Sequence, residues 1–336
     1  MAQGMIRSPI DACAAHGPSP GVYGLLESCG DLVSVVIPCY NQARFVGETI
    51  ESVLAQTHRR HEIIVVDDGS ADDDPASVVT RYGVRFIRQE RQGVATARNT
   101  GWHASHGAFV VFLDGDDRLL PEALAVGYEV FLAHPECGFV FGHGRLIDPA
   151  GCEKFPNFLP VVRDAGGYEQ FLEHNPIVFP AVAMFRRDVM EAVGGFRATV
   201  GRRRIDNASD YDLYLRVTEH FPIHSHGVPV AEWRQHGTNT SRNSIMMLHS
   251  TLAVLKSQRL PPTDRGRCRA ARRRGLKRLR TFFGEQLVEE LRNEVRARQI
   301  SWFRLCIGIL TLMRHYPSGL MENVARKTRR MIAGHS

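Results

Sequence analysis

Two clusters of aspartates carry the residue types best suited to chemistry in this chain. Asp114, Asp116 and Asp117 lie close together in FLDGDD, and Asp67 and Asp68 adjoin in VVDDGS. Neighbouring carboxylates repel one another, and a bound cation or strong hydrogen-bond donors offset that cost. Oxygen ligands of this kind suit Mg²⁺ or Mn²⁺ together with substrate phosphates. Taken alone, either cluster also describes an ordinary acidic turn.

Short runs rich in β-branched and aromatic residues precede both clusters and alternate with helical patterns. The strand-like runs lie at 33–37, 62–66, 84–87, 108–113 and 138–141, and the helical patterns lie at 94–105, 121–133 and from 209 onward. Asn41 is placed to cap a further helix after the first run. This alternation predicts an α/β fold with a parallel sheet. Ligands bind beyond the carboxyl ends of the strands in such sheets, which is where both clusters fall.

Further segments carry groups that can bind a charged substrate. Arg98 in GVATARNTG can hold a phosphate or a base carbonyl, or it can pair with one of the aspartates. In ASDYDLYLR, Asp210 and Asp212 point about 200° apart on a helix, so only one faces the site. Arg216 can pair with Asp212, which leaves Asp210 as the candidate general base. His236 in EWRQHGTNTS is a candidate metal or phosphate partner, or a structural residue.

The order of these motifs resembles glycosyltransferase family 2, whose members are inverting, nucleotide-sugar-dependent enzymes with the GT-A fold. The matching segments run from residue 33 to residue 241 and are VSVVIPCYNQARFVGETIESVLAQTHRRHEIIVVDDGSADD, RQGVATARNTG, GAFVVFLDGDDRLLPEAL, FRRDVMEAVGGF, SDYDLYLR and WRQHGTNTS. The resemblance implies a mostly parallel sheet flanked by helices, followed here by a basic helical extension.

The resemblance also implies roles for individual positions. The nucleotide-sugar-binding residues would be Pro38, Tyr40, Asp67, Asp68, Arg98 and Asp114. Asp114 and Asp116 match the D-x-D motif, in which Asp116 is the more direct ligand of Mn²⁺ or Mg²⁺. His236 matches a histidine near the metal and the diphosphate. Asp210 matches the catalytic base.

Two departures from the family pattern narrow the expected reaction. Ser209 replaces the glutamate that precedes the base, which removes a neighbouring charge that would raise the pKa of Asp210. The Q-x-x-R-W signature of processive synthases is missing, because residues 232–235 read E-W-R-Q. Transfer of a single sugar per encounter is therefore expected.

The resemblance implies a metal-dependent, inverting transfer from a UDP- or dTDP-type sugar to an acceptor hydroxyl of a glycan or lipid-linked acceptor. The setting would be the assembly of cell-surface polysaccharide, lipopolysaccharide or glycolipid. One alternative is a non-catalytic nucleotide- or glycan-binding relative, against which the retention of Asp116 and Asp210 argues. Another is a nucleotidyltransferase on a related fold, which would need a Gly-rich loop with a basic residue that PCYNQ does not supply.

Three segments are expected along the chain. Residues 1–30 predict a flexible leader, 31–248 a catalytic domain and 249–336 a basic helical extension. Within the catalytic domain, 31–145 would form the nucleotide-binding half and 146–248 the acceptor-binding half, of which the region from about 148 to 204 reads as loop-rich. The leader lacks the continuous apolar core of a secretion signal, and the seven cysteines form no C-x-x-C pair. A cytoplasmic protein with reduced thiols is therefore expected.

Charge divides the chain into parts with different tasks. From residue 251 onward there are 20 Lys and Arg against 6 Asp and Glu, a net charge of +14, and residues 1–250 hold the remaining 22 against 30, a net −8. The basic part contains an apolar stretch at 302–313 that is too short to cross a bilayer. It predicts peripheral association with an anionic membrane surface on the inner face of the cell membrane, or else a packed, solvated extension. Nucleic-acid binding is not expected, because the stretch lacks the stacking aromatics of a known module.

Overall fold

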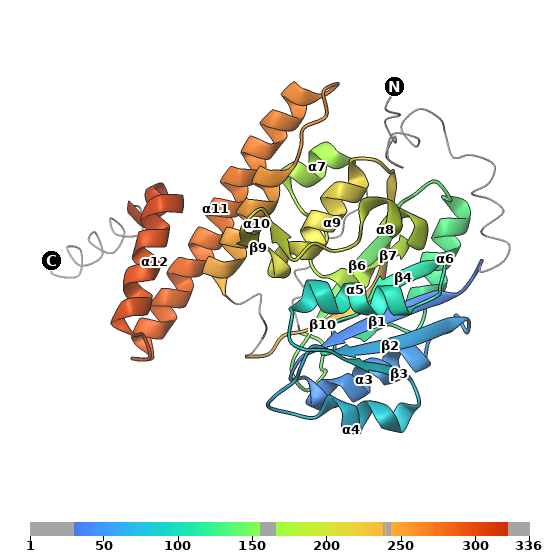
Figure 1. The fold of residues 1–336 in the computed structure, drawn as a ribbon. Coiled ribbons are helices and arrows are strands. Elements are labelled where there is room, and N and C mark those ends of the chain that lie inside the picture. Colours follow the sequence, from blue (N-terminus) through green and yellow to red (C-terminus); the bar gives the residue numbers. More distant parts are fainter. Residues whose placement is uncertain (1–29, 155–165, 238, 240–242, 322–336) are drawn as a thin grey trace, which may run out of the picture.

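A central mixed sheet organises the protein. The computed structural model describes residues 30–154, 166–237, 239 and 243–321, so nearly all of the predicted leader lies outside the described residues. Flanking helices pack on an eight-stranded sheet ordered β3-β2-β1-β4-β7-β6-β10-β5 (Figure 1). The strands are β1 (Val33–Cys39), β2 (His61–Asp67), β3 (Arg85–Arg88), β4 (Phe109–Phe112), β5 (Arg118–Leu119), β6 (Phe139–Ile147), β7 (Ala183–Arg186) and β10 (Ile223–Arg234).

The helices follow the strands along the chain. They are α3 (Ala43–Leu54), α4 (Pro75–Val79), α5 (Val94–Ala104), α6 (Ala123–Ala133), α7 (Tyr168–Glu173), α8 (Arg187–Val193), α9 (Ser209–Thr218), α10 (Ser244–Ser257), α11 (Arg265–Arg296) and α12 (Trp302–His315). Short 3-10 turns are η1 (Thr80–Tyr82), η2 (Pro180–Val182) and η3 (Asp206–Ala208), and β8 (Thr199–Val200) pairs with β9 (Arg203–Arg204) in a hairpin.

The parallel half of the sheet matches the prediction. Strands β3, β2, β1 and β4 run parallel, and every residue of β1 is buried, as expected for a central strand covered on both faces. The backbone N–H of Asp68 donates to the Cys39 carbonyl at 2.8 Å, so the ends of β1 and β2 stay together. The strand-end loops that carry the aspartate clusters therefore leave the sheet at the same edge.

The structure corrects two local expectations. The region from about 148 to 204 is more than loop, because it supplies β7, a buried strand that runs antiparallel between β4 and β6. Asn41 does not cap α3, since Gln42 holds the N-cap position without a side-chain bond. Asn41 instead has a positive φ of 52° and accepts hydrogen bonds from the backbone N–H groups of Ala71 and Asp72. The loop after β2 offers it those donors.

The predicted C-terminal helices are present. Helix α10 crosses the predicted boundary at 248, and its residues Ala253, Val254 and Leu255 belong to the same apolar core as β1. The long helix α11 carries α12 against its far end, where Leu291 and Leu312 share a smaller core (Figure 1). Of the helices in the described ranges, none is both long enough and apolar enough to span a membrane.

The contact between α5 and the sheet leaves no room for a side chain at Gly101. A Cβ there would lie 2.3 Å from Cγ1 of Val36 and 3.1 Å from Cγ2 of Val66. We expect Gly101→Ala to lower the free energy of unfolding by about 1–3 kcal/mol, measured by urea denaturation. The matched control is Gly266→Ala in α11, where a Cβ meets nothing within 4 Å. There, helix propensity alone should stabilise the protein by up to about 1 kcal/mol, and equal effects at both sites would contradict the packing argument.

Candidate active site

The acidic turn after β4 is fastened to β1 and α3. The Gly115 N–H donates to the Pro38 carbonyl at 3.2 Å. The Thr49 hydroxyl lies 3.0 Å from the Gly115 carbonyl and 2.8 Å from the Asp117 carbonyl. These bonds fix the path of the D-x-D segment relative to the predicted nucleotide-binding residues at the end of β1.

Asp116 and His236 meet although they are far apart in the sequence. Oδ2 of Asp116 lies 2.7 Å from Nε2 of His236, and both side chains are nearly buried. The His236 ring stacks on Phe45 of α3, with 5.0 Å between the ring centroids. Together they offer one carboxylate and one imidazole. No cluster of three or more His, Cys, Asp or Glu side chains that could hold a metal occurs in the described residues.

Arg234, which the sequence analysis did not single out, holds this arrangement together. It is fully buried at the end of β10. Its Nε donates to the Asp116 carbonyl at 2.9 Å, and its Nη2 donates to Glu48 at 2.7 Å. The guanidinium also lies 4.9 Å from the Phe45 ring centroid. The only signal in the sequence was its place between Trp233 and His236 in WRQH.

The predicted repulsion between carboxylates is present in the turn. Asp117 is buried, and burial followed by the charges of Asp116 and Asp114 raises the pKa of its carboxyl well above the usual range. A backbone N–H of Arg234 partly offsets this by donating to Oδ1 of Asp117 at 3.0 Å. The turn therefore gathers negative charge, and a cation bound nearby would stabilise it.

Arg98 connects the acidic turn to the candidate base. The side chain is buried, and its Nη2 donates to Oδ1 of Asp114 at 2.7 Å. Burial opposes its charge, but the nearby carboxylates of Asp114 and Asp210 raise the pKa of the guanidinium. The Cζ of Arg98 lies 5.3 Å from the centroid of the Phe196 ring. The alternative in which Arg98 pairs with a strand-end aspartate is therefore confirmed.

Asp210, the predicted base, lies in the first turn of α9. Burial raises the pKa of its carboxyl above the ordinary 3.8, the Arg98 charge opposes the shift, and the Asp114 charge adds to it. One turn later, the hydroxyl of Tyr214 is buried and has no hydrogen-bond partner in the described residues. Burial and then the Asp210 charge raise the pKa of that phenol.

The carboxylates at the end of β2, Asp67 and Asp68, accept hydrogen bonds from neighbouring loops. Asp68 accepts hydrogen bonds from Nε2 of Gln89 at 2.7 Å and from the backbone of Gln92 and Gly93 at 2.8 Å each. Asp67 is wholly buried, and its Oδ1 accepts from the Ser70 hydroxyl at 2.6 Å. The loop that Asp68 holds also brings a residue missed in the sequence to Tyr40. The guanidinium of Arg91 lies 3.9 Å from the centroid of the Tyr40 ring. The nucleotide-binding roles of Tyr40, Asp67 and Asp68 remain predictions.

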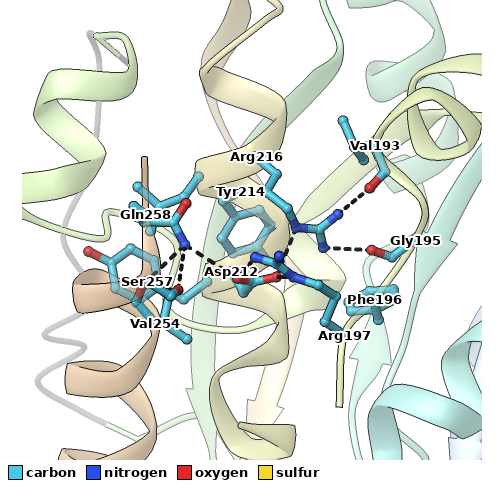
Figure 2. A network of polar contacts seen from close by, with 12 residues as sticks. Val193, Gly195, Phe196, Arg197, Asp212, Tyr214, Arg216, Val254, Ser257 and Gln258 are labelled. Atoms are coloured by element: carbon cyan, nitrogen blue, oxygen red, sulfur yellow. Dashed lines mark hydrogen bonds and ion pairs between the residues drawn. The ribbon is translucent and has the colours of Figure 1, made fainter. Parts of the chain in front are cut away.

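A buried ionic network fixes the helix that carries Asp210, as Figure 2 shows. Asp212 accepts from Nε of Arg216 at 2.9 Å, which confirms the predicted pair, and from Nε of Arg197 at 2.8 Å. Its other oxygen lies 3.3 Å from Nε2 of Gln258, just beyond α10. Arg216 in turn donates to the Gly195 carbonyl at 2.6 Å. Helix α9 is thereby joined to the 193–197 loop and to the C-terminal helices.

A solved structure shares this fold. The structure of the mannosyltransferase PcManGT from Pyrobaculum calidifontis, in complex with GDP-Man and Mn²⁺, has a TM-score of 0.55 to this protein. The likeness covers 84% of this chain and 80% of that chain at 22% identity, and it establishes the fold alone. The protein has the GT-A fold that its motif order predicts.

Sequence comparisons then identify related proteins. Residues 34–194 match the family described as Glycosyl transferase family 2. Chondroitin synthase from Escherichia coli is 28% identical over 253 residues, covering 71% of this chain and 35% of that protein. An uncharacterized glycosyltransferase from Rickettsia felis is 37% identical over 240 residues, covering 66% of this chain and 37% of that protein. Residues 34–194 therefore carry a glycosyltransferase family 2 match, and the chain spans little more than a third of the length of these relatives.

The Asp212 network should contribute strongly to stability. Asp212→Asn keeps the shape of the side chain but leaves Arg197 and Arg216 without their buried counter-charge. We expect the free energy of unfolding, measured by urea denaturation, to fall by about 3 kcal/mol. Asp188→Asn breaks a pair with Arg186 in which the carboxylate, unlike that of Asp212, is exposed, and it is the control, with an expected loss below about 1 kcal/mol. Equal losses in both variants would contradict the assignment.

Proposed function

We propose that the protein transfers one sugar from a nucleotide-sugar donor to an acceptor hydroxyl, with inversion at the anomeric carbon. The observation that carries the proposal is the position of Arg98. Its side chain donates to Asp114 of the D-x-D turn, and the charge of Asp210 on α9 contributes to its raised pKa. A donor-binding element and a candidate base thus share one buried cation. The family match supports the reaction class, and the geometry supports these residues as its site.

The donor is proposed to be a UDP- or dTDP-type sugar. The imide N–H of such a base can donate to a strand-end carboxylate, for which Asp67 and Asp68 are placed after β2. Tyr40 and the backbone of Pro38 lie at the end of the neighbouring strand β1, and Arg98 and Asp114 extend the set toward the sugar and diphosphate. These residues together constitute the proposed nucleotide-sugar site.

A divalent ion, Mn²⁺ or Mg²⁺, is proposed to bind at Asp116 and His236, with Asp114 close by. The residues fit such an ion because the turn is rich in carboxylates, whose charges raise the pKa of the buried Asp117, and because Asp116 and His236 are already in contact. Two protein ligands leave coordination positions for phosphate oxygens and water. When bound, the ion would neutralise the charge that develops on the departing nucleoside diphosphate.

Asp210 is proposed to take the proton from the acceptor hydroxyl as its oxygen attacks the sugar carbon. The new carbon–oxygen bond forms on the face opposite the departing diphosphate, and the proton ends on Asp210. A carboxylate with a raised pKa is a better base than an ordinary one, and burial supplies that shift here. The charge of Arg98 opposes the shift and favours the ionised carboxylate that accepts the proton.

The acceptor is proposed to be a glycan or a lipid-linked glycan in the assembly of cell-surface polysaccharide, lipopolysaccharide or glycolipid. The similarity to chondroitin synthase supports a carbohydrate acceptor. Helix α12 exposes Trp302 and Phe303, at 78% and 75%, and also Leu310 and Met313. We propose that these side chains and the surrounding cations hold a cytoplasmic protein on the anionic inner face of the membrane.

Substitution of the proposed base separates chemistry from donor binding. We expect Asp210→Asn to lower kcat by about 10²–10⁴-fold while the Kd for the nucleotide, measured by calorimetry, changes little. In the wild-type enzyme, acidification protonates Asp210 and removes the active form. Because the pKa is raised, activity should fall at a pH above the ordinary 3.8 of an aspartate. A variant that keeps near-normal turnover would overturn the base assignment.

Metal dependence tests the other half of the site. Release of nucleotide from a donor panel should stop in EDTA and recover with Mn²⁺ or Mg²⁺. We expect Asp116→Asn to raise the Mn²⁺ concentration for half-activation by more than about 10-fold, because a direct ligand is lost. Asp264→Asn, an exposed carboxylate preceding α11, is the matched control and should behave as wild type. Metal-independent release would contradict the proposed metal site, and no release with any donor would favour a binding-only relative.

A further inference from the structure

Basic side chains of the three C-terminal helices and of strand β9 lie in one region of the protein. Arg203 of β9, Lys256 of α10, Arg280 of α11 and Arg314 of α12 form what we call the basic cluster. Helix α10 contacts both β9 and α11, and α11 contacts α12. Burial and then the charges of Arg280, Arg203 and Arg314 lower the pKa of Lys256. Figure 1 shows β9 beside α10, and the two elements are in contact.

Two histidines belong to the same place. The rings of His249 on α10 and His315 on α12 have centroids 5.6 Å apart. Burial lowers the pKa of His315 to about 4, and the charges of His249, Arg314, Arg280 and Lys256 contribute to that shift. The pKa of His249 is lowered in the same way, by burial and by Arg203, Arg314 and Lys256. No carboxylate is among the charges that act on these groups.

The basic cluster has no counter-charge in the described part of the chain. None of its four cations forms an ion pair there, although other arginines of the same helices do, such as Arg267 with Glu169 and Arg304 with Glu290. The Nε of Arg280 is buried and has no hydrogen-bond partner among the described residues. A buried N–H without a partner costs free energy, and so do adjacent like charges. An anion with several oxygens would offset both costs.

We propose that the basic cluster is a binding site for a phosphate or diphosphate group, carried either by a soluble phosphorylated ligand or by a lipid headgroup. Planar guanidinium groups bind phosphate oxygens through paired N–H donors, and an ammonium group adds a compact charge. Three guanidinium groups and one ammonium group drawn from different elements can surround such a group. Carboxylate ligands would satisfy fewer of these donors.

The position of the basic cluster links it to the proposed active site. Arg203 precedes Arg204, whose Nη2 donates to the Gln92 carbonyl in the loop held by Asp68. On the other side, Arg314 follows the exposed Met313 of α12. A phosphate bound here would therefore lie between the face of α12 proposed to meet the membrane and the loops of the active site. That it belongs to the acceptor rests on the proposed function, whereas phosphate binding itself does not.

Calorimetry with inorganic pyrophosphate tests the site directly. The full chain is titrated in EDTA, so that no metal recruits pyrophosphate to the acidic turn. The cluster variant is Arg203→Gln/Lys256→Gln/Arg314→Gln, which removes exposed cations and leaves the partly buried Arg280 in place. We expect pyrophosphate binding to weaken by about 100-fold in this variant, and wild-type binding to weaken as salt increases.

A matched control removes the same charge elsewhere. Arg59→Gln/Arg273→Gln/Lys277→Gln also takes the net charge from +6 to +3, at exposed positions outside the basic cluster. It should bind pyrophosphate as wild type does. Equal pyrophosphate affinity in the cluster variant and the control would overturn the proposal, unless the vesicle measurement described next separates them.

Sedimentation with vesicles identifies the source of the phosphate. Vesicles of phosphatidylcholine alone are compared with vesicles containing phosphatidylglycerol. Loss of binding to the anionic vesicles in the cluster variant but not in the control supports a lipid headgroup, and loss confined to pyrophosphate supports a soluble ligand. If neither probe distinguishes the two variants, the site does not exist. Metal-dependent donor hydrolysis should persist in the cluster variant, so failure of the phosphate site and failure of the proposed transferase reaction are separately visible.

Discussion

Repulsion between the carboxylates at the strand ends is the constraint on which the rest of the site depends. The turn after β4 brings Asp114, Asp116 and Asp117 together, and two buried guanidinium groups approach it from distant parts of the chain. Arg98 of α5 bonds to Asp114, and Arg234 of β10 bonds to the backbone of Asp116 and to Asp117. Because each arginine is itself buried, neither is stable without these partners. The acidic turn and the two arginines therefore stabilise one another across α5, β10 and the loop after β4.

Two aspartates on α9 have different electrostatic surroundings. Asp212 points into the protein, where Arg197 and Arg216 neutralise it, and it serves structure. Asp210 has no such ion pair in the described residues, and burial raises its pKa although the charge of Arg98 opposes the shift. The sequence suggested that Ser209 deprives the base of a charge that would raise this pKa. The structure shows that burial, with a contribution from Asp114, raises it without that neighbour.

Local patterns predicted the parallel strands and the strand-end aspartates, because each depends on a short run of residues and on the direction of the sheet. The missed features depend on partners that no local pattern reveals. Arg234 satisfies a carbonyl at Asp116 and a carboxylate at Glu48, and Gln258 reaches Asp212 from another helix. Strand β7 escaped notice because it is short and antiparallel and follows a proline-containing turn. Asn41 fits the usual N-cap pattern, but donors from the loop after β2 compete for its side chain.

The C-terminal helices contact the elements that carry the proposed site. Gln258 follows α10 and contributes to the network that fixes α9, while Val254 packs in the core that contains β1. The strong positive charge of this part of the chain therefore lies on a rigid support that is continuous with the helix carrying Asp210. A negatively charged catalytic edge and a positively charged extension, joined through one buried network, place opposite electrostatic fields at a fixed separation. Such an arrangement suits the proposed reaction, in which a cation binds with the donor and an anionic group holds the acceptor.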